Sequence, residues 1–270
     1  MTIEARPVAA MTIAGSDSGG GAGIQADLRT FAAHGVHGVC VLAALTAQNT
    51  QGVEAVHVPP ADFVRAQIDT CFRDFNIVAV KLGMLANAET VEAVAEALEV
   101  HRPRSVVLDP VMVATSGARL LDADAQRVLR ERLLPLADVL TPNIPEAEWL
   151  LGHAIADAEA AKSALDELRP LGARAVMLKG GHLDEGPLVH DRWADDEGMA
   201  TFVHARLDME GHGTGCTLAS AIAANLALSL SPRQAAERAS DYVARALALG
   251  YRPGQTGLHV LDHFGAMRPA

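Results

Sequence analysis

Short apolar runs alternate with helix-patterned segments along most of the chain, and this alternation constrains the fold more than any other feature. Residues 36–47 form a nearly unbroken apolar run, which is typical of a strand covered on both faces. Residues 88–100 instead carry apolar side chains three or four positions apart, which indicates a helix with one buried face. Strands that alternate with helices favour a mainly parallel, doubly wound sheet. The sequence therefore predicts an α/β fold in a single domain spanning residues 1–270.

The same patterns predict the bounds of the other elements. The predicted strands are residues 9–14, 36–47, 53–58, 78–82, 105–108, 139–141, 175–178, 188–193 and 200–204. The predicted helices are residues 24–33, 61–71, 88–100, 123–134 and 157–171, one beginning within 142–146, one following Gly213, and 232–249. The last two strands are expected to form a hairpin at the edge of the sheet, as a small flap.

Composition and charge exclude several classes of protein. Half of the residues are hydrophobic and only 4% are aromatic, so the core is expected to be aliphatic. A formal charge of −11 argues against a surface for nucleic acid or acidic membranes. Because no apolar run is long enough to span a membrane and no signal-peptide pattern opens the chain, a soluble cytoplasmic protein is expected. The cysteines, Cys40, Cys71 and Cys216, are too far apart to suggest disulfides or a thiolate zinc site.

Functional candidates follow the predicted strands at their carboxyl ends. These residues are Gly15, Gln48, Met84, Asp109, Asn143 and Lys179. The carboxyl ends of parallel strands meet at one edge of the sheet, where open α/β sheets bind ligands. The sequence therefore predicts that these six residues share a single cleft.

A glycine turn precedes the most uniformly apolar of the predicted helices. Gly213, Thr214 and Gly215 lead into a long run of small and apolar residues, with Cys216 in the first turn. Unpaired N–H groups and the helix dipole make such a helix start a cradle for a phosphoryl group. The same environment is expected to lower the pKa of the Cys216 thiol, which could then accept a proton during phosphoryl transfer. A purely structural interpretation also fits, with an ordinary helix start and a small core cysteine.

Two acidic residues and one lysine follow neighbouring strands. Carboxylates from Asp109 and Glu146 could hold Mg²⁺ beside nucleotide phosphates if they converge on one cleft. Lys179 could neutralise phosphate charge in the same cleft. The structural alternatives are a helix cap or a solvated loop for each carboxylate and a strand-end lysine for Lys179.

The glycine-rich stretch after the first strand does not match either standard nucleotide fingerprint. Residues 15–21 read Gly-Ser-Asp-Ser-Gly-Gly-Gly. A P-loop needs Lys followed by Ser or Thr after its last glycine, and a dinucleotide loop needs GxGxxG spacing. The stretch therefore favours a ligand loop of another kind and argues against a dinucleotide oxidoreductase.

Seven segments together resemble the ribokinase-like superfamily, and within it the hydroxymethylpyrimidine/phosphomethylpyrimidine kinases of thiamine biosynthesis. The segments are AGSDSGGGAGIQADLRTF, LTAQNTQGV, KLGML, VLDPVM, LTPNIPEAEWLLG, MLKGGH and HGTGCTLASAIAANLA, in that order from residue 14 to 227. The resemblance implies an ATP- and Mg²⁺-dependent kinase. Its substrates would be 4-amino-5-hydroxymethyl-2-methylpyrimidine and then the monophosphate. It also implies a ribokinase-like fold and a homodimer.

The resemblance assigns a role to individual residues. Gly213, Thr214 and Gly215 correspond to the anion hole and Cys216 to the base. The substrate-contact positions are Gly15, Asp27, Gln48, Met84 and Val111. The ATP-binding positions are Lys179, Asn143, Gly213 and Gly215, and the metal-binding positions are Asp109 and Glu146. The Gln48 amide offers both donors and an acceptor, which is complementary to an aminopyrimidine edge.

Three alternatives to this interpretation remain. Pyridoxal kinase shares the fold and sometimes the cysteine, although Gln48 within TAQNT favours the pyrimidine. A binding protein without turnover and a dinucleotide oxidoreductase are the alternatives from other classes. One departure from the family pattern concerns Glu210 and Gly211, where the family often has Asn-Thr, and a negative charge there is expected to affect nucleotide binding.

Overall fold

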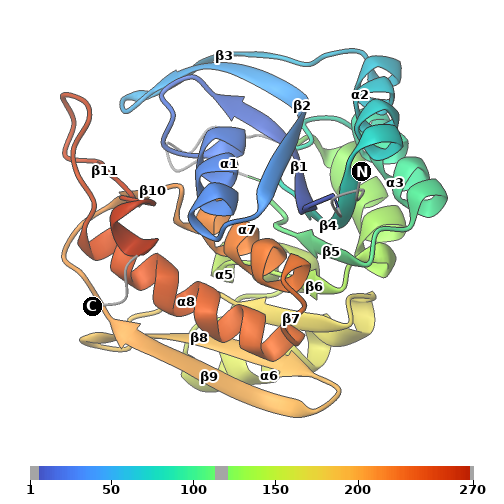
Figure 1. Ribbon diagram of the computed structural model, residues 1–270. Helices are drawn as coiled ribbons and strands as arrows, with labels where there is room; N and C mark the ends of the chain where they lie inside the picture. Colours follow the sequence, from blue (N-terminus) through green and yellow to red (C-terminus); the bar gives the residue numbers. More distant parts are fainter. Residues whose placement is uncertain (1–5, 113–120, 268–270) are drawn as a thin grey trace.

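The strands pair into one nine-stranded sheet, and helices connect most of them (Figure 1). The computed structural model describes residues 6–112 and 121–267. The strands are β1 (Val8–Asp17), β2 (His37–Asn49), β3 (Gly52–His57), β4 (Asn76–Leu82), β5 (Ser105–Leu108), β6 (Val139–Leu140), β7 (Ala175–Leu178), β8 (Leu188–Asp195) and β9 (Gly198–Ala205). Their order is β3-β2-β1-β4-β5-β6-β7-β8-β9. The strands from β2 to β7 in this order run parallel, whereas β3, β8 and β9 pair antiparallel at the two edges. The predicted mainly parallel sheet with an edge hairpin is confirmed.

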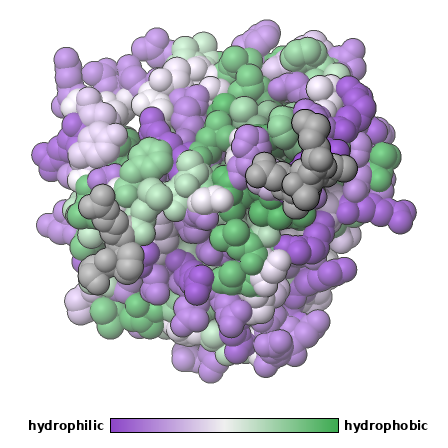
Figure 2. Space-filling view, viewed as in Figure 1, coloured by the Kyte–Doolittle hydropathy of each residue, from purple (hydrophilic) through white to green (hydrophobic). Residues whose placement is uncertain are grey.

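Helices cover both faces of this sheet, as a doubly wound fold requires. One face carries α1 (Gly23–Ala33), α7 (Thr214–Ala227) and α8 (Pro232–Ala248). The other face carries α2 (Ala61–Asp74), α3 (Ala88–His101), α4 (Ala123–Val128), α5 (Ile144–Leu151) and α6 (Ala158–Leu168). The two faces enclose two separate aliphatic cores. Viewed from the same side as Figure 1, polar residues cover most of the surface and apolar residues gather in a central band (Figure 2).

The structure departs from the predicted bounds at a few places. β1 continues through Gly15 to Asp17, because β2 pairs with it along this stretch, whereas a loop was predicted there. The helix predicted over residues 123–134 changes to a π-helical turn at Leu129–Leu133 and then to a 3₁₀ turn at Leu134–Leu136, because Pro135 cannot donate the N–H that a longer helix would need. A small parallel pair, β10 (Gly211–His212) with β11 (His259–Val260), was not predicted because two residues show no periodicity. No helix within the described ranges combines the length and hydropathy that crossing a membrane requires.

The close packing of α7 on the sheet follows from small side chains on both elements. Ala10 of β1 and Ala79 of β4 point to the side of the sheet that α7 covers, and both are fully buried. α7 itself is buried on all sides over its last three turns, residues 217–227, where alanine predominates. Because alanine lets two backbones approach closely, α7 lies directly against the sheet with its first turn at the carboxyl edge of the strands.

A buried ion pair lies between α7 and the sheet. The Lys81 ammonium on β4 lies 2.9 and 3.0 Å from the two carboxylate oxygens of Asp27 on α1, and neither side chain is exposed. The Asp27 carboxylate also accepts hydrogen bonds from the hydroxyl groups of Thr12 and Ser220, at 2.6 and 2.7 Å. Every oxygen of Asp27 is therefore paired, as a charge removed from water requires.

Replacing one member of this pair should be strongly destabilising. Lys81→Met leaves the Asp27 carboxylate buried without a counter-charge, so the free energy of unfolding is expected to fall by about 3–5 kcal/mol. Adding Asp27→Asn removes the orphaned charge, and the double variant is expected to be more stable than Lys81→Met alone. Urea unfolding of the two single variants and the double variant measures this difference. A double variant less stable than either single variant would contradict the ion-pair account.

Candidate active site

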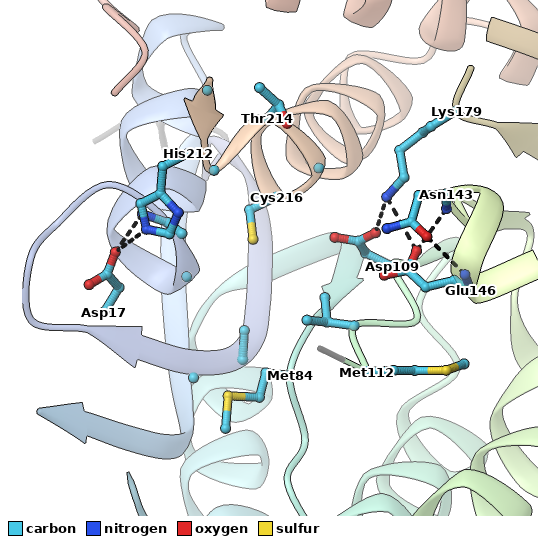
Figure 3. Close-up of a pocket in the computed structure, with 18 of the residues that line it drawn as sticks. Asp17, Met84, Asp109, Met112, Asn143, Glu146, Lys179, His212, Thr214 and Cys216 are labelled. Atoms are coloured by element: carbon cyan, nitrogen blue, oxygen red, sulfur yellow. Dashed lines mark hydrogen bonds and ion pairs between the residues drawn. The ribbon is translucent and has the colours of Figure 1, made fainter. Parts of the chain in front are cut away.

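A cavity of about 860 Å³ opens at the carboxyl edge of the central strands, where the sequence predicts a cleft (Figure 3). Its lining comes from the ends of β1, β2, β4, β5, β6 and β7 and from the segment that leads into α7. Of the residues that the sequence singles out, it includes Gly15, Gln48, Met84, Asp109, Val111, Asn143, Glu146, Lys179, Gly213, Thr214, Gly215 and Cys216. The prediction that the six strand-end residues share one cleft is confirmed.

The start of α7 lines the middle of this cavity, between one end at Asp17 and His212 and the other end at Lys179 (Figure 3). The N-cap residue Gly213 has φ of +85°, a left-handed conformation that favours glycine, and Thr214 begins the helix. No side chain caps this helix start, so the first backbone N–H groups remain available to a ligand. The glycine turn and the helix that follows it are confirmed, and their geometry matches an anion cradle.

The glycine-rich stretch after β1 packs against this turn. A Cβ atom on Gly213 would lie 2.0 Å from the carbonyl oxygen of Gly21, and one on Gly21 would lie 2.5 Å from the His212 ring. The two segments therefore approach as closely as backbone atoms allow. Gly21 therefore packs directly against the α7 turn and helps to fix its position.

Asp17 holds the two segments together. Its carboxylate accepts hydrogen bonds from the backbone N–H groups of Gly19, Gly21 and Ala22 at 2.8–3.0 Å. The His212 Nε2 atom lies 3.0 Å from the same carboxylate. Burial raises the pKa of Asp17, but the hydrogen bonds from His212 and from the backbone outweigh burial and hold the pKa below its ordinary value. Asp17 therefore remains a carboxylate and ties the α7 turn to the end of β1.

A Lys179-centred cluster occupies the opposite end of the cavity (Figure 3). The Lys179 ammonium lies 2.8 Å from a carboxylate oxygen of Asp109 and 3.6 Å from one of Glu146. A Cβ atom on Gly215 would lie 3.1 Å from the same ammonium, so the first turn of α7 borders the cluster directly. Burial acts to lower the pKa of Lys179, but the two carboxyl groups raise it above its ordinary value. Lys179 is therefore a permanent positive charge beside the helix start.

Asn143 and Glu146 form a capping box at the start of α5, which explains their spacing. The Asn143 side chain accepts a hydrogen bond from the Glu146 N–H at 2.8 Å, and Glu146 Oε2 accepts one from the Asn143 N–H at 2.7 Å. Burial raises the pKa of Glu146 well above the usual carboxyl range, although Lys179 opposes the shift. Asp109 and Glu146 thus share the single positive charge of Lys179. A second cation bound between the two carboxyl groups would therefore be stabilised.

The acidic residues could supply only part of a metal's coordination. Across residues 6–112 and 121–267, no group of three or more His, Cys, Asp or Glu side chains could hold a metal ion by itself. Mg²⁺ commonly binds through one or two carboxylates while phosphate oxygens and water complete its octahedron. Asp109 and Glu146 match that donor set.

Cys216 lies between the two ends of the cavity, but its pKa is opposite to the sequence prediction (Figure 3). The helix start was expected to lower the pKa of the thiol. Removal from water instead raises it to about 11, although the Lys81 ammonium acts in the lowering direction. Desolvation by segments that are distant in the sequence, with the Asp27 and Asp109 carboxylates, outweighs the Lys81 ammonium, so Cys216 is mostly a neutral thiol at pH 7.

Asp27 is the predicted site residue that does not line the cavity. Its carboxylate is unexposed and engaged by Lys81, Thr12 and Ser220, so the structure assigns it a position below the cavity floor. The predicted direct contact with substrate is therefore corrected to a contact with Lys81, which does line the cavity.

Several lining residues were not predicted from the sequence. They are Ser16, Asp17, Thr46, Lys81, Met112, Trp149, His182 and His212. The sequence carried a signal for two of them. Asp17 lies within the glycine-rich stretch, and His212 directly precedes the glycine turn.

Adding a methyl group to Gly213 should be far more destabilising than adding one to another glycine with positive φ. Gly152 has φ of +80°, but its Cβ position has no neighbour within 4 Å. Gly152→Ala therefore measures the conformational cost alone, about 1–2 kcal/mol. Gly213→Ala adds a collision with the Gly21 carbonyl and is expected to lower the free energy of unfolding by about 3 kcal/mol or more. Equal losses in urea unfolding would show that the turn does not pack as described.

Comparisons with known proteins agree with this geometry. A model of the family described as phosphomethylpyrimidine kinase matches residues 17–260. The thiamine biosynthesis bifunctional protein ThiED of Geobacter sulfurreducens is 52% identical over 246 residues, which are 91% of this chain and 50% of that protein. The chain thus spans about half the length of this relative. A hydroxymethylpyrimidine/phosphomethylpyrimidine kinase of Rhizobium meliloti is 48% identical over 90% of this chain and 91% of its own length.

Among solved structures, the pyridoxal kinase from Staphylococcus aureus in complex with AMP-PCP and pyridoxal has a TM-score of 0.87 to this chain. It is 31% identical, and the match covers 97% of this chain and 94% of that one. The backbone similarity therefore extends over nearly the whole chain, at a lower identity than that of the sequence relatives.

Proposed function

The chain belongs to the phosphomethylpyrimidine kinase family, and we propose that it phosphorylates 4-amino-5-hydroxymethyl-2-methylpyrimidine and then its monophosphate, using ATP. Its fold is ribokinase-like, as the sequence predicts. The observation that carries the proposal is the cavity itself. It brings the Gln48 amide, the α7 helix start with Cys216, and the Lys179 cluster into one space.

The arrangement of the cavity suggests where each reactant binds. The aminopyrimidine ring lies at the end formed by Gly15, Gln48 and Met84, and Val111 contacts its other face. The triphosphate extends toward Lys179, and the γ-phosphoryl group lies at the N–H groups of Gly213 to Cys216. The hydroxymethyl oxygen then attacks phosphorus as the bond to ADP breaks. Fixed donors at the site of developing charge and close positioning provide most of the acceleration.

Mg²⁺ is the cation that this donor set suits best. Asp109 and Glu146 would hold it together with phosphate oxygens, and Lys179 would then be released from the carboxylates toward the phosphates. The bound ion supplies charge neutralisation for the transferring group. Asn143 acts mainly through the capping box, which fixes the position of Glu146.

Cys216 acts in the first transfer, because the substrate hydroxyl must lose its proton there. A thiol with a pKa of about 11 is mostly protonated at pH 7, so only a small thiolate fraction can accept this proton. In the second transfer the attacking group is a phosphate monoester, whose oxygen is already ionised. The demand for a base is therefore confined to the first step.

Pyridoxal is the alternative substrate, since the pyridoxal kinase match covers nearly the whole chain. Relatives named as hydroxymethylpyrimidine/phosphomethylpyrimidine kinases are more similar, at 41–48% identity against 31% for that pyridoxal kinase. The Gln48 amide, which matches an aminopyrimidine edge, also favours the pyrimidine.

We further propose a cytoplasmic homodimer that binds small molecules and neither nucleic acid nor membrane. The net charge of −11 supports the absence of a nucleic-acid surface. Exposed apolar side chains at the sheet edges support self-association. They are Leu45 and Val56 at the β2–β3 edge and Met199 and Val203 on β9.

An assay with separated products tests the proposed function. With ATP and Mg²⁺, the protein is expected to convert the hydroxymethylpyrimidine to the monophosphate and the diphosphate, with a higher kcat/KM than for pyridoxal. Omitting Mg²⁺ should abolish both transfers. Equal or greater kcat/KM for pyridoxal would reject the substrate assignment, and no transfer to any of these substrates would reject the kinase assignment.

Cys216→Ala should separate the two transfers. Single-turnover rates isolate the chemical step from product release. The first transfer is expected to slow by about 100-fold or more in the variant, and the second to change far less. In the wild type, the first rate should rise by about tenfold per pH unit between pH 7 and 9, because the thiolate fraction rises below a pKa of about 11. A flat pH profile, or equal losses in both steps, would reject the proton-acceptor role.

A further inference from the structure

The side-chain amide of Gln48 has a polar neighbour at each end. Its oxygen lies 3.0 Å from the hydroxyl oxygen of Thr46, and its nitrogen lies 3.4 Å from His212 Nε2. Rotating the amide by 180° exchanges the two atoms and moves nothing else. Whether the Thr46 hydroxyl and His212 Nε2 act as donors or acceptors toward the amide therefore decides which of its ends is the oxygen.

The Thr46 hydroxyl has only one hydrogen, and a second acceptor competes for it. Thr46 Oγ1 also lies 2.8 Å from the backbone carbonyl oxygen of Ser16, which can only accept. If the hydroxyl donates to Ser16, its lone pairs face Gln48 and require a donor there. The NH₂ end of the amide satisfies that requirement, whereas the oxygen end would leave two acceptors facing each other.

The His212 end leads to the same orientation by a separate route. Asp17 Oδ2 already accepts from the backbone N–H groups of Gly21 and Ala22, so it is an acceptor toward His212 Nε2 as well. His212 Nε2 must then carry a hydrogen, and an NH₂ group facing it would oppose two donors. The oxygen end of the Gln48 amide avoids this opposition, because at 3.4 Å it can share with Asp17 the single hydrogen on Nε2.

The backbone of Gln48 is held as firmly as its side chain. The Ser18 hydroxyl accepts from the Gln48 N–H at 2.8 Å and donates to the Gln48 carbonyl oxygen at 2.7 Å. These two hydrogen bonds hold the Gln48 backbone at the end of β2 against the glycine-rich stretch.

We propose that Thr46 and His212 are positioning residues that lock the Gln48 amide with its nitrogen toward Thr46 and its oxygen toward His212. One N–H bond and one oxygen lone pair of the Gln48 amide then remain for the ligand. The N–H lies on the Thr46 side of the amide and the lone pair on the His212 side. The identity of the ring that they contact rests on the proposed function.

This order distinguishes a 4-aminopyrimidine from a 4-oxopyrimidine. The 4-amino ring presents an acceptor nitrogen and a donor amine, which match the N–H and the oxygen of the locked amide. The amine adjoins the carbon that bears the hydroxymethyl group, and the oxygen end of the locked Gln48 amide faces His212, the residue that precedes the α7 turn. The reacting hydroxyl is thereby directed toward α7.

A 4-oxo ring presents a donor and an acceptor in the reverse order. Turning that ring over would restore the match but would carry the hydroxymethyl group away from α7. The lock therefore selects the 4-amino substrate through orientation as well as through affinity.

Substrate preference in Thr46 variants tests the lock. Thr46→Val keeps the shape of the side chain but removes its hydroxyl, and Thr46→Ser restores the hydroxyl. The ratio of kcat/KM for the 4-amino substrate to that for its 4-oxo analogue is expected to fall by about tenfold or more in Thr46→Val. Thr46→Ser should retain the wild-type ratio. Equal losses on both substrates, with the ratio unchanged, would overturn the proposal.

A measurement on the ligand-free protein keeps this test independent of turnover. The side-chain NH₂ signals of Gln48 in a ¹⁵N–¹H spectrum can be identified by their disappearance in Gln48→Glu. Thr46→Val is expected to shift both proton signals and speed their exchange with water, and Thr46→Ser to preserve them. Unchanged signals in Thr46→Val would overturn the lock even if the kinase activity is as proposed. Shifted signals, together with no phosphorylation of either pyrimidine, would reject the proposed function and retain the lock.

Discussion

The close contact between α7 and the parallel sheet is the interaction on which the site depends. Alanine side chains on α7 and on the facing positions Ala10 and Ala79 let the helix lie directly on the strands. A bulkier interface would move the first turn of α7 away from the strand ends. Because that turn provides the backbone N–H groups that would bind a phosphoryl group, packing in the core determines the geometry of the cavity.

Buried ion pairs and hydrogen-bonded groups surround this helix start. Lys81 and Asp27 lie beneath it, Asp17 and His212 lie on one side, and Lys179 with its two acidic partners lies on the other. These groups are mostly removed from water, so the charges of the Lys81–Asp27 pair and of the Lys179 cluster are held in place and screened little by solvent. A phosphate entering this space meets donors and charges that the fold already holds near it, and Lys179 alone must exchange its carboxylate partners for phosphate oxygens.

The sequence predicted the features that follow from local pattern and from the geometry of parallel sheets. The strand-end residues from Gly15 to Lys179 converge because parallel strands place their carboxyl ends together. The predicted substrate contact of Asp27 and the predicted lowering of the Cys216 pKa were wrong, because both properties depend on burial by distant segments. The family resemblance assigned Asp27, within the predicted helix 24–33, to the substrate, but Lys81 and Ser220 enclose it in the fold. The Cys216 helix start is local, whereas the desolvation that raises its pKa comes from the whole site.

Several residues serve the local backbone and the site at once, which explains why single motifs were ambiguous in the sequence. The Asn143–Glu146 spacing is a capping box by geometry, and the same box presents the Glu146 carboxyl group to the Lys179 cluster. The Asp17 carboxylate likewise accepts hydrogen bonds from three backbone N–H groups, and its contact with His212 Nε2 requires a hydrogen on that nitrogen. A structural and a functional interpretation of such residues do not compete, because the cap or turn is the means by which the functional group is held. Thr46 is held in a similar way, because its hydroxyl bonds to the backbone of Ser16 and also contacts the Gln48 amide. In the proposed lock this hydroxyl touches no reacting atom, but it fixes the orientation of the amide and thereby the ring edge that the cavity accepts.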